Sequence, residues 1–240
     1  MRLDRFLVKT DICSRSEAKK LIRSGRVCVN GEALRDPSVH VDENFDEITF
    51  DGETVVYEDY RYYMLNKPQG YVSATEDGAS ATVLDLLEGV NKKDLFPVGR
   101  LDKDTEGLLL ITNDGKLAHE LLSPKKHVDK RYYAKVDKRL TSDELTVFAG
   151  GIDIGDEKPT LPARIEECDD TDTPSYLVTI SEGRYHQIKR MFNAFGANVT
   201  FLKRLSMGSL VLDKDLESGQ FRKLEKGETD DLLKIGEADG

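Results

Sequence analysis

The sequence contains no long hydrophobic run and only three cysteines. No apolar stretch approaches the roughly 20 residues that a membrane-spanning helix requires, and the first ten residues resemble an amphipathic helix more than a signal sequence. Cys13, Cys28 and Cys168 have neither the paired spacing of a disulfide framework nor the spacing of a zinc site. We therefore expect a cytoplasmic protein with reduced structural thiols and no association with membranes.

Internal repeats, low-complexity segments and a regular βαβ rhythm are also missing. The 240 residues suffice for one large domain or two unequal ones, of which we expect two, and 38% hydrophobic with 33% charged residues is typical of a globular protein. Short strands mix with helices without strict alternation. This pattern favours the α+β class with a largely antiparallel sheet over a doubly wound fold.

The net charge of -10, taken alone, argues against a nucleic-acid partner, because phosphate contacts need a positive surface. The charges are segregated, however. Residues 1–26 hold eight basic and three acidic residues, a local balance of +5, and residues 183–204 hold five basic residues and no acid, whereas residues 36–60 hold nine acids and no base. Charge runs are usually solvated faces, but this segregation favours basic surfaces that bind an anion.

Residues 1–60 look like a separate small module, because a helical pattern gives way to hairpin-like strands before the pattern restarts. Ser14 and Glu17 form a capping-box pattern that opens a second, basic helix. The dipeptides Asn30-Gly31 and Asp51-Gly52 are strong signals for tight hairpins. The module is expected to consist of two basic helices leaning on a small sheet.

The remainder, residues 61–240, is predicted to alternate irregularly between strands and helices. Strands are expected at 62–65, 108–112, 132–136, 163–166, 176–181 and within 198–212. Helices are expected near 82–87, 116–122, 142–148 and 185–195. The last dozen residues are polar enough to fray.

The densest group of polar residues lies between Gly99 and Gly107, just before an apolar strand. Two glycines bracket a charged loop that the strand would hold rigidly, which is typical of a loop that presents functional side chains. Asp102 lies between Arg100 and Lys103, so its carboxylate would stay ionised if these cations approached it. An ionised carboxylate can act as a nucleophile. The alternative is a charged surface loop with turn hydrogen bonds.

This loop and three other stretches resemble, in order, the motifs of the pseudouridine synthases. They read MLNKPQGYV, GRLDKDTEG running on to Gly115, KRY, and SEGRYHQIKRMF, beginning at residues 64, 99, 130 and 181. The module 1–60 is similar to the alpha-L RNA-binding fold, which often precedes this catalytic domain. The resemblance thus covers almost the whole chain. It implies an α+β protein with an RNA-binding module over 1–60 and a mixed, largely antiparallel catalytic domain over 61–240.

The resemblance also implies roles for individual residues. Asp102 would be the nucleophile that attacks the sugar C1′ or the ring C6, or it would assist through a glycal-like intermediate, and no metal or redox cofactor would be required. Tyr132 would pack on the target uracil, Arg184 would pair with the catalytic aspartate, and Arg100 would help to hold the RNA open around a flipped base. Further RNA contacts are expected from Lys189, Arg190, Arg2, Lys9, Arg15, Lys19, Arg23 and Arg26.

The helix expected near 185–195 would pack one side inward, formed by Tyr185, Ile188, Phe192 and Phe195. His186 and Gln187 are interpreted as structural residues that bond to neighbouring backbone. A histidine base or metal ligand is the weaker alternative, because no second histidine stands at ligand spacing.

The run Gly-Arg-Tyr-His-Gln-Ile-Lys-Arg-Met-Phe resembles the branch acting on small-subunit (16S) ribosomal RNA more than its large-subunit relatives. The expected partner is ribosomal RNA, within a partly assembled small subunit, bound by a monomer. The alternatives are a synthase acting on large-subunit RNA, a non-catalytic RNA-binding assembly factor, and a hydrolase that uses Asp102 and Asp104. In an extended loop those two carboxylates should point to opposite sides, which disfavours the hydrolase.

Overall fold

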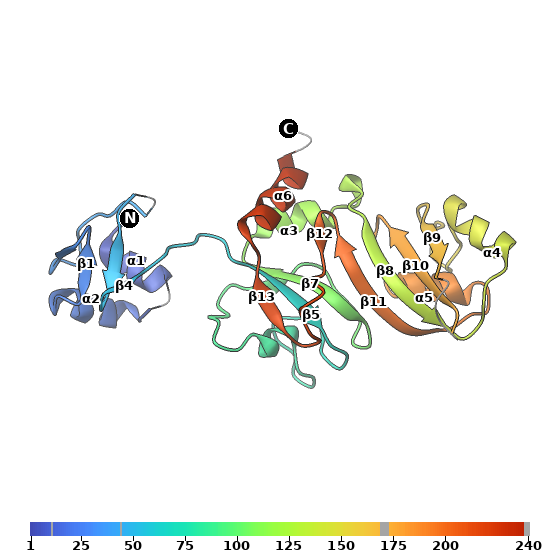
Figure 1. Cartoon of the computed structure of the whole chain (residues 1–240), viewed down its shortest axis with the longest axis horizontal. Helices are drawn as coiled ribbons and strands as arrows, with labels where there is room; N and C mark the ends of the chain where they lie inside the picture. Colours follow the sequence, from blue (N-terminus) through green and yellow to red (C-terminus); the bar gives the residue numbers. More distant parts are fainter. Residues whose placement is uncertain (11, 44, 169–172, 238–240) are drawn as a thin grey trace. The chain divides into compact units, whose positions relative to one another are not determined.

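The structure is a computed structural model that describes residues 1–10, 12–43, 45–168 and 173–237. The chain divides into two compact units, Met1–Tyr60 and Arg61–Gly240, which are labelled by element in Figure 1. Each unit has a hydrophobic core of its own, so each is described by itself. None of the helices within the described ranges is both long and apolar enough to cross a lipid bilayer.

The first unit packs two helices on a small antiparallel sheet. The helices are α1 (Leu3–Lys9) and α2 (Arg15–Arg23), and the sheet has the order β2-β1-β3-β4, with bounds Glu32–Ala33, Val27–Val29, Ile48–Phe50 and Glu53–Thr54. The predicted capping box of Ser14 and Glu17 is present at the start of α2. Both predicted hairpin dipeptides have positive φ at each residue, the conformation that a tight type I′ turn requires.

A nine-stranded sheet forms the centre of the second unit. Its order is β13-β5-β7-β11-β8-β10-β9, with β6 paired to β7 and β12 paired to β11. Strands β7 and β11 run parallel, and the other pairs described are antiparallel. The bounds are Tyr62–Lys67 (β5), Phe96–Pro97 (β6), Glu106–Thr112 (β7), Lys130–Val136 (β8), Arg164–Glu167 (β9), Ser175–Ile180 (β10), Val199–Met207 (β11), Leu210–Val211 (β12) and Phe221–Lys223 (β13).

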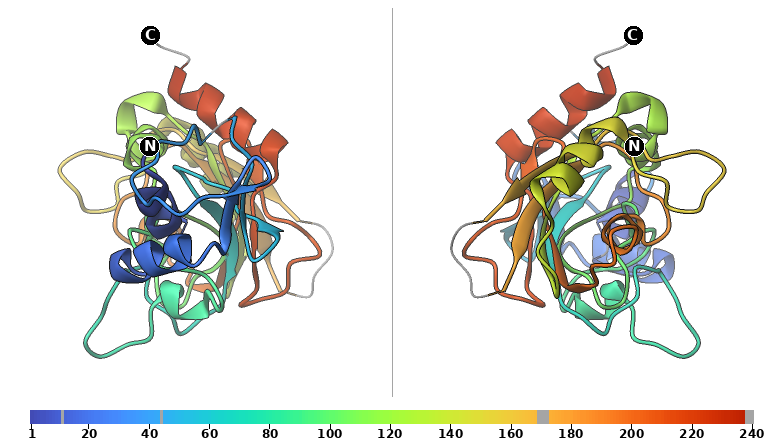
Figure 2. Two further views of the ribbon diagram at one scale, coloured as in Figure 1. Left: turned by 90° about the vertical axis from the view of Figure 1, so that its left-hand side faces the viewer. Right: turned by 90° about the vertical axis from the view of Figure 1, so that its right-hand side faces the viewer.

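Both faces of this sheet are buried, because alternate residues of its central strands enter two separate cores. Leu109 and Ile111 of β7 pack in the core that includes α5 (Gln187–Asn193), whereas Leu108 and Leu110 pack in the core that includes α3 (Gly115–Leu122) and α6 (Lys226–Glu237). Helices α3 and α6 lie side by side (Figures 1 and 2). A strand buried on both faces is a continuous apolar run, as β7 is. The short helical segments are α4 (Ser142–Val147), η1 (Val83–Leu86), η2 (Pro124–Lys126) and η3 (Phe148–Gly150).

The predicted α+β class with a largely antiparallel sheet is confirmed, and two local predictions are wrong. Fraying is predicted for the last dozen residues, but helix α6 extends to Glu237, and its Leu232 is fully buried. The helix expected from Tyr185 begins at Gln187, because His186 adopts a left-handed conformation with φ 49°. Tyr185 therefore stands outside the helix and is 71% exposed instead of packing inward.

Candidate active site

A buried lysine fixes the backbone of the polar loop between β6 and β7. Lys67 lies at the end of β5, and its Nζ donates hydrogen bonds to the carbonyl oxygens of Pro68 (3.0 Å), Asp102 (3.0 Å) and Thr105 (2.9 Å). Burial lowers the pKa of Lys67 to about 8, although the neighbouring carboxylates act in the opposite direction. Lys67 thus attaches the loop to the central sheet at Asp102.

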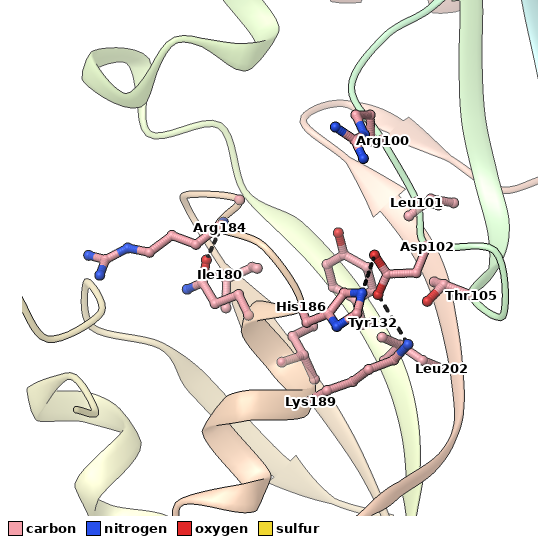
Figure 3. Close-up of a pocket in the computed structure, with 13 residues that line it drawn as sticks. Arg100, Leu101, Asp102, Thr105, Tyr132, Ile180, Arg184, His186, Lys189 and Leu202 are labelled. Carbon is pink, nitrogen blue, oxygen red and sulfur yellow. Dashed lines mark hydrogen bonds and ion pairs between the residues drawn. The ribbon is translucent and has the colours of Figure 1, made fainter. Parts of the chain in front are cut away.

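The carboxylate of Asp102 faces two cationic or ionisable side chains, those of His186 at the start of α5 and of Lys189 within α5 (Figure 3). Lys189 Nζ lies 3.1 Å from Asp102 Oδ2, and His186 Nε2 lies 3.5 Å from Asp102 Oδ1. Lys189 also donates to Asp104 Oδ1 at 2.6 Å. Burial alone would lower the pKa of Lys189, but its bonds to Asp104 and Asp102 outweigh that effect and raise it. A charged ammonium therefore accompanies the Asp102 carboxylate.

Asp104 does not point away from Asp102, because both carboxylates contact the same ammonium of Lys189. The prediction that they point to opposite sides is wrong. Partial burial would raise the pKa of Asp104, yet the hydrogen bond and charge of Lys189 lower it overall. A hydrolytic pair needs one carboxylic acid with a raised pKa, and the lowered pKa of Asp104 does not suit it for that role.

Tyr132 of β8 and Asp102 line the same hollow. A small cavity of about 80 Å³ opens between them, with an apolar wall formed by Leu101, Ile180, Ile188 and Leu202. It adjoins a larger cavity of about 380 Å³ that also reaches Asp102 and Tyr132. Tyr132 is only 8% exposed and packs in the hydrophobic core, while it also lines both cavities. The site combines an anionic oxygen, a fixed aromatic ring and an apolar wall, which suits a flat, uncharged ring bound next to a nucleophile.

Comparison with known proteins decides the family. The family model of RNA pseudouridylate synthases matches residues 61–194, and that of the S4 domain matches residues 1–46. The chain belongs to the RNA pseudouridine synthases. It is 44% identical to the uncharacterized RNA pseudouridine synthase YtzG of Bacillus subtilis, over 95% of this chain and 96% of that protein.

Relatives of this pseudouridine synthase with a more specific name are nearly as similar. The ribosomal small subunit pseudouridine synthase A of Haemophilus influenzae is 41% identical over 98% of this chain and all of that protein. The enzyme of the same name from Escherichia coli K12 is 41% identical over 95% and 98%. A crystal structure of a pseudouridylate synthase superposes with a TM-score of 0.67 at 39% identity and covers 97% of this chain and 99% of the other.

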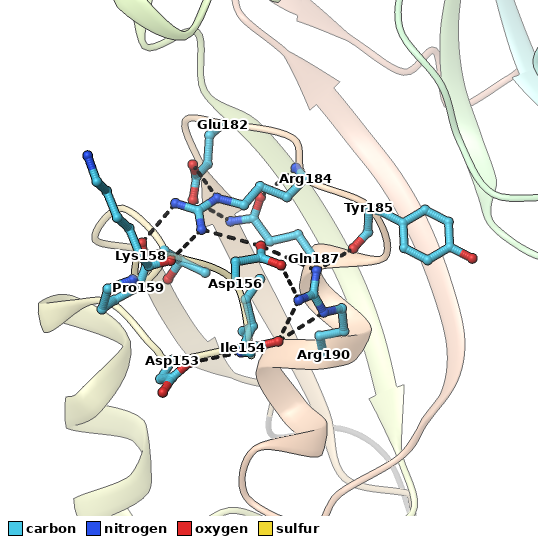
Figure 4. A network of polar contacts seen from close by, with 12 residues as sticks. Asp153, Ile154, Asp156, Lys158, Pro159, Glu182, Arg184, Tyr185, Gln187 and Arg190 are labelled. Atoms are coloured by element: carbon cyan, nitrogen blue, oxygen red, sulfur yellow. Dashed lines mark hydrogen bonds and ion pairs between the residues drawn. The ribbon is translucent and has the colours of Figure 1, made fainter.

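In this pseudouridine synthase Arg184 does not pair with Asp102, contrary to expectation. Its guanidinium extends away from the carboxylate (Figure 3). It bonds Glu182 Oε2 (3.0 Å) and the carbonyl oxygens of Lys158 (2.6 Å) and Pro159 (2.8 Å) (Figure 4). The cation beside Asp102 is instead that of Lys189, in the first turn of α5.

The polar residues around the start of α5 differ in what their side chains contact. Arg190 bonds the Ile154 carbonyl and both carboxylate oxygens of Asp156, so it braces the loop that also receives Arg184 (Figure 4). Gln187 is structural, as predicted, since it accepts from the Arg184 amide (2.9 Å) and donates to Glu182 (3.0 Å). Gln187 also lines the smaller cavity, and His186 lines both, stacks on the Tyr185 ring and lies beside Asp102.

The other expected RNA-binding residues differ in whether their side chains are paired with another residue of the chain. Arg100 lines both cavities of this pseudouridine synthase. In the first unit Arg2 pairs with Asp4, Lys9 with Tyr57 and Asp59, and Arg26 with Asp51. Within the described part of the chain, no ion pair is recorded for three exposed cations of α2, namely Arg15, Lys19 and Arg23. These three are the expected RNA-binding residues of α2, and the helix carries a further exposed cation, Lys20.

Proposed function

We propose that the chain isomerises one uridine of small-subunit (16S) ribosomal RNA to pseudouridine, with Asp102 as the nucleophile. The substrate is proposed from the relatives named ribosomal small subunit pseudouridine synthase A, to which the similarity extends over both units. The enzyme would act in the cytoplasm as a monomer, on RNA in a partly assembled small subunit, and it would need no cofactor.

The observation that carries this proposal is the position of the Asp102 carboxylate. It borders the cavity beside the Tyr132 ring, while Lys189 holds a positive charge 3.1 Å from its oxygen. A uridine flipped out of its stack could place its uracil against Tyr132 and its glycosidic bond near Asp102. Stacking on an aromatic ring contributes about 1–3 kcal/mol per base.

The reaction is an isomerisation, so the atoms of the nucleotide balance without a second substrate. The bond from the sugar C1′ to the ring N1 breaks, the uracil rotates, and a bond forms from C1′ to C5. The proton lost from C5 is matched by a proton gained at N1. Asp102 would attack C1′ or C6, or would assist a glycal-like intermediate, and each of these routes needs an anionic oxygen beside the nucleotide.

The substrate is tested by mapping pseudouridine in ribosomal RNA of cells that lack this chain. We expect one position of the small-subunit RNA to lose its modification and to regain it when the parent gene is restored, but not when Asp102→Asn is supplied. Loss of a site in the large-subunit RNA would reassign the substrate. An unchanged map in both RNAs would leave a non-catalytic assembly factor as the better interpretation.

The role of Asp102 is tested by single-turnover assays on the mapped RNA. Asp102→Asn keeps the shape but removes the anionic oxygen, so it should fold, bind RNA as tightly as the parent and form no detectable pseudouridine. Asp104→Asn removes the same charge from the same loop and contacts the same lysine, so it is the matched control and should retain turnover. Robust turnover by the Asp102 variant would overturn the assignment, and equal loss in both variants would indicate loop geometry instead.

A further inference from the structure

The larger cavity beside Asp102 has a floor that the proposed chemistry does not use. It reaches past Tyr132 to two basic residues, Lys130 at the start of β8 and Arg204 in β11. Both are almost completely buried, with exposed fractions of 6% and 2%. Burying a cation costs free energy unless a carboxylate or another anion accompanies it, so the presence of two here needs an explanation.

The protein itself satisfies these cations only in part. Arg204 Nε donates to the Leu108 carbonyl at 2.7 Å, but its buried Nη2 has no partner. Lys130 Nζ donates to the Val128 carbonyl at 2.8 Å. Within the described residues, neither cation forms a recorded ion pair. Burial first, and then the charge of Arg204, lower the pKa of Lys130 to about 8.

The two nearby carboxylates are already paired with other cations. Asp129 acts to raise the pKa of Lys130, but its carboxylate bonds Arg164 at 2.6 Å. Asp102 borders the same cavity, and its ion-pair contacts are with Lys189 and His186. The floor therefore holds positive charge that no recorded acidic partner offsets.

The strand register places these cations next to the ring that would hold the uracil. Arg204 is the direct cross-strand partner of Tyr132, so the two side chains project from one face of the sheet. Lys130 is two residues before Tyr132 on the same strand and shares that face, about 7 Å away along the strand. A β-bulge follows Arg204 in β11, and bulges commonly re-aim a side chain at a functional site.

We propose that Arg204 and Lys130 form a phosphate subsite that binds a backbone phosphate flanking the flipped uridine. The inference rests on the proposed function and adds the group that holds the sugar. A guanidinium fork matches phosphate oxygens, and an ammonium adds a second charge-assisted bond. Because the reaction separates uracil from ribose, the base and the sugar each need a binding site of their own. Tyr132 holds the ring that must rotate, and the phosphate subsite holds the sugar that must stay.

Binding of small ligands to the full chain tests this subsite without any need for turnover. We expect the parent to bind UMP about 10- to 100-fold more tightly than uridine, the range for charge-assisted hydrogen bonds. Lys130→Met and Arg204→Met should reduce this ratio to about one. Arg131→Met is the matched control, because Arg131 projects to the opposite face, and it should keep the ratio. Arg204→Lys, which retains the charge, should keep part of it if Arg204→Met fails to fold.

An RNA with one neutral methylphosphonate beside the target uridine, on the 5′ or the 3′ side, then links the subsite to catalysis. On ordinary RNA, Lys130→Met should lower the single-turnover efficiency about 10- to 100-fold. On one of the two neutralised RNAs the parent and the variant should react equally slowly. An undiminished difference on both RNAs, or equal binding of UMP and uridine by the parent, would overturn the phosphate subsite. Absence of pseudouridine with every RNA, while UMP is still preferred, would refute only the proposed function.

Discussion

Lys67 is the residue that positions the proposed nucleophile, because its ammonium bonds the Asp102 carbonyl and two further carbonyls around the loop. Lys67→Met keeps most of the volume but removes the donor of these three bonds, so that the Asp102 carbonyl keeps only the Thr105 N–H (3.0 Å). We expect the free energy of unfolding to fall by about 2–3 kcal/mol. Single-turnover pseudouridine formation should fall ~100-fold, the effect of misplacing a reacting group by about 1 Å. Denaturant melts and rapid-quench assays measure the two effects.

The matched control for Lys67 is Lys103→Met in the same loop. Lys103 donates to the Ser80 hydroxyl at the surface (3.1 Å), so its loss should leave both the melt and the rate close to those of the parent. If Lys67→Met retained the rate of the parent, the loop would hold Asp102 in place without its lysine, and our account of the anchor would be wrong.

The low pKa of Lys130 should make the stability of the fold depend on pH. Its folded pKa is about 8, whereas a lysine of the unfolded chain titrates near about 10.4. Between these values the unfolded state binds more protons, so the free energy of unfolding rises with pH, and the cost of the buried ammonium is fully present below pH 8.

Comparison of the parent with Lys130→Met isolates this contribution. As the pH rises from 8 to about 10, the difference in unfolding free energy should move in favour of the parent, by up to about 1.4 kcal/mol per pH unit. Denaturant titrations at several pH values provide the measurement. A difference that does not vary with pH would mean that the folded pKa is unperturbed.

At single residues the sequence motifs located the aspartate loop and Tyr132 but misassigned the cation beside them. The structure brings the side chains of Asp102 and Tyr132 to one cavity from separate segments, the loop before β7 and the strand β8. The order of the motifs alone made this proximity an expectation. Which basic side chain reaches Asp102 depends on where α5 starts. The left-handed residue His186 moves that start and exchanges Arg184 for Lys189, and a histidine with positive φ has no reliable sequence signal.

At the scale of elements, the parallel contact of β7 with β11 depends on the lack of a side chain at Gly107. A Cβ there would lie 2.2 Å from the Arg204 carbonyl oxygen and 2.8 Å from its nitrogen, and φ is +99°. Gly107→Ala should therefore force the two strands apart and strain the backbone. We expect the unfolding free energy to fall by about 2–5 kcal/mol, from overpacking and an unfavourable φ together.

Gly115→Ala is the control for this element. Gly115 begins α3, has no positive φ and has open space where a Cβ would stand, so alanine there should leave stability unchanged or raise it by up to about 1 kcal/mol. Thermal melts of both variants provide the comparison. A Gly107 variant as stable as the parent would show that the two strands can separate without cost. Because Arg204 is on β11, the same variant should also weaken the proposed preference for UMP.

The elements that the sequence predicted well are those with a strong local signal. The apolar run of β7 and the capping box of α2 are recognisable from the residues, because burial on both faces and a Ser–Glu pair each leave a distinct pattern. Strand β13 and helix α6 have no such pattern. A three-residue strand and a helix with four acidic and two basic residues among its twelve are held by tertiary contacts that the sequence does not reveal. Examples are Leu232 in the core and Arg222 bonded to Glu228.

At the scale of the whole molecule, the sign of the net charge is a poor guide to the partner. The chain carries -10, yet the first unit presents the exposed cations of α2, and the second has a cavity with buried cations at its floor. A long-range repulsion from the acidic regions is screened within about 8–10 Å at physiological salt. Local basic sites can therefore bind phosphate although the average charge is negative. This distribution also predicts that RNA affinity depends steeply on salt.

We expect the first unit to dock the RNA and the second to carry out the chemistry. The triple reversal of Arg15, Lys19 and Arg23 to Glu removes three exposed cations for which no ion pair is recorded in the described chain. It should weaken RNA binding most at low salt, and it should flatten the slope of log affinity against log salt by ~0.7–0.9 for each phosphate that is no longer neutralised. The single-turnover rate at saturating RNA should stay that of the parent, since none of these residues lines the catalytic cavity.

The control must change the net charge equally without touching α2. Lys92, Lys93 and Lys214 are exposed residues of the second unit, and their reversal to Glu alters the charge by the same amount. Because a general repulsion would act on both triple variants, only a direct contact with the RNA would separate them. Filter binding at a series of salt concentrations gives both slopes. Equal weakening by the two variants, or an unchanged slope for the α2 variant, would show that α2 does not dock the RNA.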